Sequence, residues 1–459
     1  MSEFRIRVLG KLPPADPAAV LRATPAGSAP VLLDDSAQGG GLLAWHPDRR
    51  VEWTLPRLAA QDHGGPAARW PIAAEDPLLA WQREAEQEAW SCELSLPWFG
   101  GWLGFLGFEA GHAYLPFPWT RPEPSGLPHA SFARYPRSLW FSPEATYVLG
   151  TEDEAAAWLA EARGVVAAAQ QLPAPRLPEL NFERSVSAEA FQQGVAHLRD
   201  QIGAGELFQA NLSHRLSAPH RGDPRASYAA LRPAQPTRMS AYWEDEQGRA
   251  LLSWSPERFL SWHGERLQTR PIKGTAPRAM DRQEDARLAA ALEASEKERA
   301  ELTMIVDMAR NDLGQVAQPG SVQVLSPGEV EPYPTLFHRT ATVEARLRDG
   351  AGLAEILRAS FPPASVTGAP KVRALQAIAE LEQEQRGAYC GALGIWVPGQ
   401  RRADFSVLIR TASCAAGSLH LRVGAGIVWD SDPRREWEET LVKARYLESL
   451  HEPASLRVR

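Results

Sequence analysis

The sequence has little cysteine, no long apolar run and no excess of basic residues. Its 459 residues include only three cysteines, Cys92, Cys390 and Cys414, which are widely spaced and form no Cys-x-x-Cys pair. This spacing excludes a disulfide framework, argues against a cysteine-rich zinc site and favours a reducing compartment. We therefore expect a cytoplasmic protein.

Several other classes of protein are also disfavoured. The formal net charge of −7 argues against an extended nucleic-acid or anionic-membrane surface. No stretch of about 18 apolar residues is present, so we expect no membrane span. Residues 1–12 alternate polar and apolar side chains like a half-buried strand and lack the apolar run of a secretory signal.

The chain has two regions of different amino-acid composition. Ten of the 16 tryptophans lie before residue 160, among many glycines and prolines, which favours short antiparallel strands with aromatic side chains in the core. We predict an N-terminal region over 1–171, a proline-rich connector over 172–184 and a C-terminal catalytic region over 185–453.

Strands and helices are expected in separate runs, which favours an α+β fold over a parallel βαβ fold. Ser187 is placed to cap a helix with an apolar stripe from Phe191 to Ile202. Further predicted elements are helices over 154–171, 282–313, 370–384 and 434–450, and strands over 208–212, 250–254, 393–397, 405–411 and 419–423.

Two predicted helices each carry a pair of glutamates three residues apart. Glu298 and Glu301 share a helix face with apolar residues, and Glu436 and Glu439 share a face with Lys443. If both pairs point inward they need a cation, and oxygen ligands suit Mg²⁺ better than Zn²⁺. Spacing alone also allows two solvated faces with ordinary Glu–Lys pairs.

Three glycine-bearing turns could bring backbone N–H groups close to an anion: residues 271–275, 367–371 and 424–426. None of them has the spacing of a P-loop or of a dinucleotide-binding fingerprint. Each turn by itself is also compatible with a purely structural role.

Taken together, a set of ordered motifs resembles the chorismate-utilising enzymes, and within them the component I enzymes of the aminodeoxychorismate branch. The matching strings span about 250 residues: Gly205-Glu-Leu-Phe-Gln-Ala-Asn-Leu-Ser213, Ser255-Pro-Glu-Arg-Phe259, Arg270-Pro-Ile-Lys-Gly-Thr-Ala-Pro-Arg278, Asp307-Met-Ala-Arg-Asn-Asp-Leu313, Ser365-Val-Thr-Gly-Ala-Pro-Lys-Val-Arg373, Asp404-Phe-Ser406, Ile409-Arg-Thr411, Gly424-Ala-Gly-Ile-Val428 and Glu439-Thr-Leu-Val-Lys-Ala-Arg445. The resemblance implies two large antiparallel sheets packed as a sandwich with helices outside.

Two positions indicate the branch. Lys273 stands where the aminodeoxychorismate enzymes have lysine and where the anthranilate, isochorismate and salicylate synthases have alanine. Gln209 stands where the isochorismate and salicylate synthases have a water-activating lysine. The resemblance therefore implies covalent catalysis by Lys273 and amination by ammonia rather than hydroxylation by water.

The resemblance also implies roles for the remaining site residues. Glu257 would be the general acid, and His338 would support the site. Mg²⁺ would be held by Glu298, Glu301, Glu436 and Glu439. Chorismate would be contacted by Gly274, Thr275, Ser365, Tyr389, Arg410, Gly424, Ala425, Gly426 and Lys443.

The N-terminal region resembles the family more loosely. In relatives it helps to form a tryptophan pocket, which here corresponds to Ser36, Arg238, Met239 and Ser240. Tryptophan is therefore an expected ligand of unassigned role.

Two alternatives remain open: an anthranilate synthase component I, and a non-catalytic regulator that binds tryptophan or chorismate. None of the three cysteines lies in a suitable nucleophile motif, so we expect no glutaminase within the chain. The expected partners are thus chorismate, ammonia and a separate glutaminase subunit.

Overall fold

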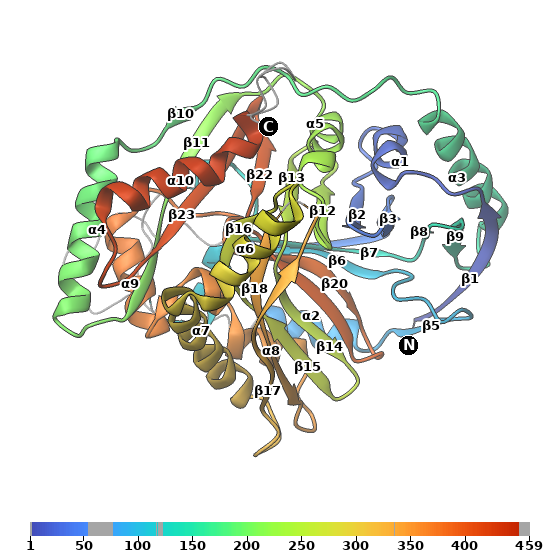
Figure 1. Cartoon of the computed structure of the whole chain (residues 1–459). Helices are drawn as coiled ribbons and strands as arrows, with labels where there is room; N and C mark the ends of the chain where they lie inside the picture. Colours follow the sequence, from blue (N-terminus) through green and yellow to red (C-terminus); the bar gives the residue numbers. More distant parts are fainter. Residues whose placement is uncertain (1, 54–76, 116, 118–122, 335, 449–459) are drawn as a thin grey trace, which may run out of the picture.

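The computed structural model describes residues 2–53, 77–115, 117, 123–334 and 336–448. Residues 449–453, the end of the predicted C-terminal region, lie outside this part. Figure 1 shows two large sheets with helices arranged around them.

The first sheet has thirteen strands in the described part of the chain. Twelve follow one path, and β19 (Gly368–Ala369) pairs with β11. The path runs through β10 (Glu183–Arg184), β11 (Gln209–Pro219), β23 (Ser418–Ile427), β22 (Thr411–Ala415), β13 (Ala250–Ser255), β12 (Met239–Glu244), β2 (Val31–Asp35), β3 (Gly40–Ala44), β8 (Ser138–Phe141), β9 (Thr146–Gly150), β1 (Glu3–Leu12) and β5 (Ala89–Cys92).

The second sheet has ten described strands. Nine follow one path, and β17 (Gln323–Pro332) pairs with β18. The path runs through β16 (Ile272–Pro277), β18 (Leu336–Arg346), β15 (Arg266–Arg270), β14 (Arg258–His263), β21 (Arg402–Val407), β20 (Ala392–Val397), β6 (Gly101–Leu106), β7 (Ala130–Tyr135) and β4 (Arg49–Trp53).

The helices lie around these sheets (Figure 1). The predicted cap of one of them is confirmed, because the Ser187 hydroxyl accepts the Ala190 N–H at 3.2 Å. The α-helices are α1 (Pro17–Ala23), α2 (Pro77–Ala85), α3 (Ala155–Ala169), α4 (Ala188–Gly203), α5 (Pro224–Leu231), α6 (Arg282–Ala294), α7 (Glu296–Gly314), α8 (Leu353–Ser360), α9 (Lys371–Leu381) and α10 (Pro433–Glu448), and the 3₁₀ turns are Phe108–Ala113, Arg232–Ala234 and Ala364–Val366.

The two sheets pack face to face through apolar side chains. Phe105 of β6 meets Trp243 of β12 edge to face, with ring centroids 4.8 Å apart. Both rings belong to a buried cluster that draws on strands of both sheets. The expected α+β sandwich is confirmed, and strands from before residue 172 and after residue 184 occur in each sheet.

Two predicted elements are each divided in the structure. The helix expected over 282–313 ends at Ala294 and restarts at Glu296, because the Ser295 hydroxyl accepts the Glu298 N–H and begins a new helix. The strand expected over 405–411 ends at Val407, and the chain turns through Arg410, whose φ is 50°, before β22 begins. The first break sets the start of the helix that carries Glu298 and Glu301.

Among the helices of the described residues, none combines the length and the apolar character that crossing a membrane requires.

The close approach of neighbouring strands gives a stability prediction. A Cβ at Gly394 in β20 would overlap the carbonyl oxygen of Asp404 in β21. We expect Gly394→Ala to lower the free energy of unfolding by at least about 2 kcal/mol. Gly164 in α3 has nothing within 4 Å of its Cβ position, so Gly164→Ala should raise it by about 0.5–1 kcal/mol. Urea unfolding of both variants checks this, and equal effects would contradict it.

Candidate active site

Lys273 lies at a bulge in β16, the edge strand of the second sheet. Ile272 pairs with Thr340 and Thr275 pairs with His338, so Lys273 and Gly274 together oppose one residue of β18. A bulge of this kind redirects a side chain and is frequent beside active sites. Gly274 has φ +82°, and a Cβ there would lie 3.1 Å from Glu298 Oε2, so this position favours glycine.

The bulge directs the Lys273 amine toward the first sheet. A Cβ built on Gly426 in β23 would lie 3.3 Å from Lys273 Nζ and 3.0 Å from Gln209 Nε2. Gln209 begins β11, which pairs with β23. The amine therefore lies beside the backbone of β23, where the edge strand β16 of the second sheet approaches the first sheet.

Glu257 lies just before β14 and is 4% exposed. Burial raises the pKa of Glu257 to about 7. The Ser365 hydroxyl and the Ile272 N–H both donate hydrogen bonds to this carboxyl group, and together with the Lys273 charge they oppose the rise. A carboxylic acid with this pKa keeps a transferable proton near neutral pH.

His338 is buried beside the bulge. Its Nδ1 lies 2.9 Å from Thr275 Oγ1. Burial, and then the charge of Arg410, lower the pKa of His338 to about 3. The ring is therefore neutral at ordinary pH and can hold Thr275 by a hydrogen bond.

Tyr389 and Lys443 lie against the β23 segment that carries the predicted anion-binding glycines. A Cβ on Gly424 would lie 2.9 Å from Tyr389 Oη. Lys443 of α10 donates a hydrogen bond to the Gly424 carbonyl oxygen at 2.9 Å. Ala425 packs its methyl group into a buried cluster with Leu212, so only its backbone is placed for a polar ligand.

The four glutamates come to the same region, but they do not form a ligand set. Burial and the Glu301 carboxylate raise the pKa of Glu298, which also feels Glu439 of α10. Burial and Glu439 raise the pKa of Glu436 too. In the described part of the chain, however, no three histidine, cysteine, aspartate or glutamate side chains converge to hold a metal ion.

These carboxylates nevertheless fit a hard divalent cation by their chemistry. All the donors are oxygens, and the raised pKa values of Glu298 and Glu436 show two carboxylates that a positive charge would stabilise, while, despite burial, Lys443 lowers the pKa of Glu439. Lysines balance part of the charge, with Lys443 Nζ 2.7 Å from Glu439 and Lys297 Nζ 3.9 Å from Glu301.

Two of the four residues predicted to contact tryptophan, Ser36 and Ser240, form a hydroxyl cluster between β2 and β12. The Ser36 hydroxyl donates to the Thr237 carbonyl oxygen at 2.9 Å and lies 3.3 Å from Ser240 Oγ. Arg238 is exposed and its charge acts on Asp35, while Met239 is half-buried. In this arrangement the two serine hydroxyls bond to their neighbours.

A buried ion pair that the sequence did not reveal lies behind the predicted substrate contacts. Arg386 and Glu382 have side chains 0% and 1% exposed, and two nitrogens of Arg386 bond the carboxylate at 3.0 and 2.7 Å. Burial raises the pKa of Glu382, but Arg386 and Arg422 hold it below its usual value. The carboxylate therefore stays charged inside the protein.

This pair joins three segments of the site. Arg386 donates to the carbonyl oxygens of Val366, next to Ser365, and Asn211 in β11. Glu382 accepts the backbone N–H and the hydroxyl of Ser213, which pairs with Gly424.

A second buried carboxyl group, that of Glu109, fixes the turn that precedes Tyr389, and burial raises its pKa to about 8. Glu109 is 0% exposed and accepts the N–H groups of Arg386 and Gly387 at 2.7 and 3.0 Å. The sequence did not predict these buried groups. Glu382 and Arg386 are four residues apart, a spacing that is also common on exposed helix faces, and no local pattern indicated that Glu109 is buried.

The chain matches the family model described as chorismate binding enzyme over residues 29–449. It is 36% identical over 393 residues to the anthranilate synthase component 1 of Streptomyces coelicolor, and the aligned region covers 81% of this chain and 76% of that protein. It is 37% identical over 378 residues to the aminodeoxychorismate synthase component 1 of Salmonella typhimurium, which covers 81% of this chain and 82% of that protein.

Solved structures agree with this similarity. The anthranilate synthase component I of Streptococcus pneumoniae superposes with a TM-score of 0.75 at 30% identity, covering 89% of this chain and 92% of that one. The menaquinone-specific isochorismate synthase of Escherichia coli, at 18% identity, shares the fold with a TM-score of 0.69 and covers 97% of each chain.

The buried ion pair gives a testable difference from a surface pair. Arg386→Met leaves Glu382 buried with only Arg422, at 3.3 Å, as a charged partner. We expect a loss of about 3 kcal/mol in the free energy of unfolding. Arg434 is 81% exposed and pairs with Glu438, so Arg434→Met should cost less than about 0.5 kcal/mol. Denaturant unfolding compares the two, and a loss below 1 kcal/mol for Arg386→Met would be inconsistent with this role.

Proposed function

The chain belongs to the chorismate-binding enzyme family, and from its site we propose that it is an aminodeoxychorismate synthase component I. In this proposal it converts chorismate and ammonia into 4-amino-4-deoxychorismate and water, a step toward 4-aminobenzoate and folate. The ammonia comes from glutamine through a separate glutaminase subunit, and free ammonia replaces it in the test tube.

One observation carries the choice of reaction. Lys273 brings its amine to the backbone of Gly426, and its charge acts on the buried acid Glu257. Relatives named as anthranilate and as aminodeoxychorismate synthases match at similar identity, so identity does not separate the two. A nucleophilic amine paired with an acid favours the covalent route to the 4-amino product.

In the proposed reaction, the neutral Lys273 amine attacks C2 of chorismate, and both conjugated ring double bonds shift, C1=C2 to C1=C6 and C5=C6 to C4=C5, as the C4 hydroxyl leaves. Glu257 gives its proton to that hydroxyl, which departs as water. Ammonia then bonds to C4, and the C2–nitrogen bond to Lys273 breaks. The enolpyruvyl group is retained throughout.

The remaining residues bind and orient the substrate. In this proposal Arg410, Tyr389 and the N–H groups of residues 424–426 hold the enolpyruvyl carboxylate. Lys443 helps to balance charge at the same strand. His338 and Thr275 hold the strand that carries Lys273, and Gly274 allows helix α7 to approach.

We further propose that Mg²⁺ is bound by Glu298, Glu301, Glu436 and Glu439. The ion would supply positive charge to the ring carboxylate of chorismate. The support is the all-oxygen donor set and the charge that these side chains share. Binding would require the four side chains to turn toward one another.

The second candidate function is that of an anthranilate synthase component I, which the similarity to relatives of that name favours. That reaction gives fluorescent anthranilate and pyruvate. We also propose tryptophan as a regulatory ligand that binds near Ser36 and Ser240.

Product identification tests the function. With chorismate, Mg²⁺ and ammonium, we expect a non-fluorescent aminated product that a lyase converts to 4-aminobenzoate. Lys273→Ala should lower the rate at least about a hundredfold, since it removes the nucleophile. Lys11→Ala, at an exposed site on β1, should leave the rate unchanged. Anthranilate with pyruvate, or full activity of Lys273→Ala, would refute the proposal.

The pKa of Glu257 predicts the pH profile. Because the acid works only when protonated, kcat/KM for chorismate should fall about tenfold per pH unit above about pH 7. The Ser365 hydrogen bond lowers this pKa, so Ser365→Ala should move the fall to higher pH. His338→Asn should leave its position unchanged, since that ring is already neutral. Rates are measured at constant free ammonia, and a fall that moves to lower pH in Ser365→Ala would contradict the assignment.

A further inference from the structure

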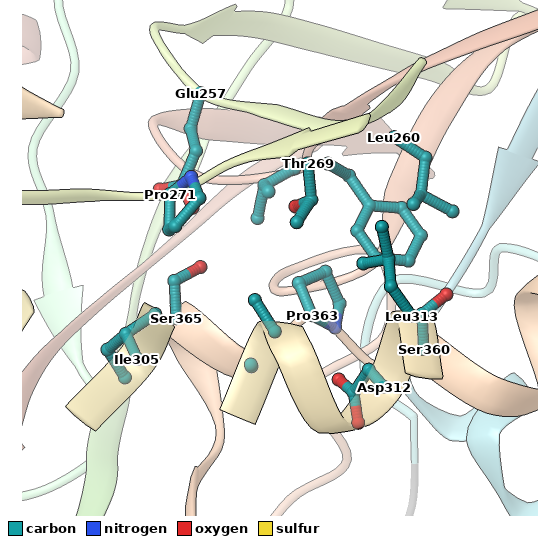
Figure 2. A pocket seen from close by; sticks show the side chains of 14 residues that line it. Glu257, Leu260, Thr269, Pro271, Ile305, Asp312, Leu313, Ser360, Pro363 and Ser365 are labelled. Atoms are coloured by element: carbon teal, nitrogen blue, oxygen red, sulfur yellow. The ribbon is translucent and has the colours of Figure 1, made fainter. Parts of the chain in front are cut away.

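A small cavity lies directly behind Glu257. It has a volume of about 20 Å³ and is enclosed by α7, by strands of the second sheet and by the segment from Ser360 to Ser365 (Figure 2). A space of this size holds about one water molecule. It is far too small for chorismate.

The cavity has polar groups at its ends and apolar walls between them. Figure 2 shows the hydroxyl groups of Ser365 and Thr269 directed toward its open centre. Ile305 and Ala309 of α7 line one wall. Asp312 lines the far end, where it accepts a hydrogen bond from Lys371 at 2.8 Å.

We propose that this cavity is the site that binds ammonia before it attacks C4. The proposal rests on the proposed function, in which the hydroxyl leaves C4 beside Glu257 and nitrogen arrives at the same carbon. A nitrogen source must therefore lie close to the Glu257 carboxyl group, and Glu257 is one of the residues that line the cavity. Ammonia is about the size of water and fits this space.

The lining suits neutral ammonia. Its N–H groups can donate to the hydroxyl oxygens of Ser365 and Thr269, leaving the lone pair free to attack carbon. An ammonium ion would lose its hydration between apolar walls, which is far more costly than burying a neutral molecule. The apolar walls therefore favour the neutral form, and the carboxylate of Asp312 at the far end is already paired with Lys371.

The protons balance at Glu257. The acid first gives its proton to the leaving hydroxyl, which departs as water and leaves a carboxylate. When ammonia bonds to C4, the new nitrogen centre carries one proton too many and passes it to that carboxylate. The sum is chorismate plus ammonia giving aminodeoxychorismate plus water, with Glu257 protonated again.

Filling the cavity tests this site. Ala309→Val adds two methyl groups to the wall, so we expect KM for ammonium to rise at least about tenfold while KM for chorismate stays within about twofold. Ala300 is exposed on the same helix, so Ala300→Val places the same residue in the same helix outside the cavity. It should change neither constant. An unchanged KM for ammonium in Ala309→Val, or an equal rise in both constants, would overturn the proposal.

A second variant guards against a folding failure of the first. Thr269→Val keeps the shape of the side chain and removes a hydroxyl from the cavity, so it should also raise KM for ammonium selectively. A Thr269→Val enzyme with both constants unchanged would count against the site. If the wild-type chain gives no aminated product from chorismate, the proposed function itself fails. If the wild-type chain is active but KM for ammonium is unchanged by these substitutions, only the ammonia site fails.

Discussion

The buried pair of Glu382 and Arg386 holds together the segments on which the candidate site depends. Removing two charges from water costs several kcal/mol per ion, and only close hydrogen bonds on every side recover it. Here those bonds go to Ser213, Asn211 and Val366. The same contacts that make the charges tolerable therefore fix β11 and the turn of Ser365 relative to each other.

The second constraint is the approach of β16, the edge strand of the second sheet, to β23 of the first. Lys273 belongs to β16 of the second sheet, but its amine lies at Gly426 in β23 of the first. Glu257 precedes β14, and its hydrogen-bond partner Ser365 comes from a 3₁₀ turn more than a hundred residues later. The proposed nucleophile and acid thus both come from the second sheet, and packing against the first sheet brings β23 to the amine.

Local sequence signals were reliable where short-range physics decides the structure. The Ser187 cap and the apolar stripe predicted helix α4, which runs from Ala188 to Gly203. Two local breaks were nevertheless not predicted. The break at Ser295 was missed because the flanking residues are all compatible with one helix, and the turn at Arg410 was missed because its φ of 50° has no local marker such as glycine or asparagine.

By itself, the sequence determined the family, through residue types in a fixed order, and it supplied the side chains that we propose as nucleophile, acid and anion ligands. Only the tertiary structure decided their electrostatic state and surroundings. Glu257 has a pKa of about 7 and His338 one of about 3 because strands distant in sequence bury them. Burial of Glu257 and His338, the bonds that Arg386 and Glu382 make to Asn211 and Ser213, and the cavity behind Glu257 all arise from contacts between segments far apart along the chain, and spacing within a sequence carries no record of such contacts.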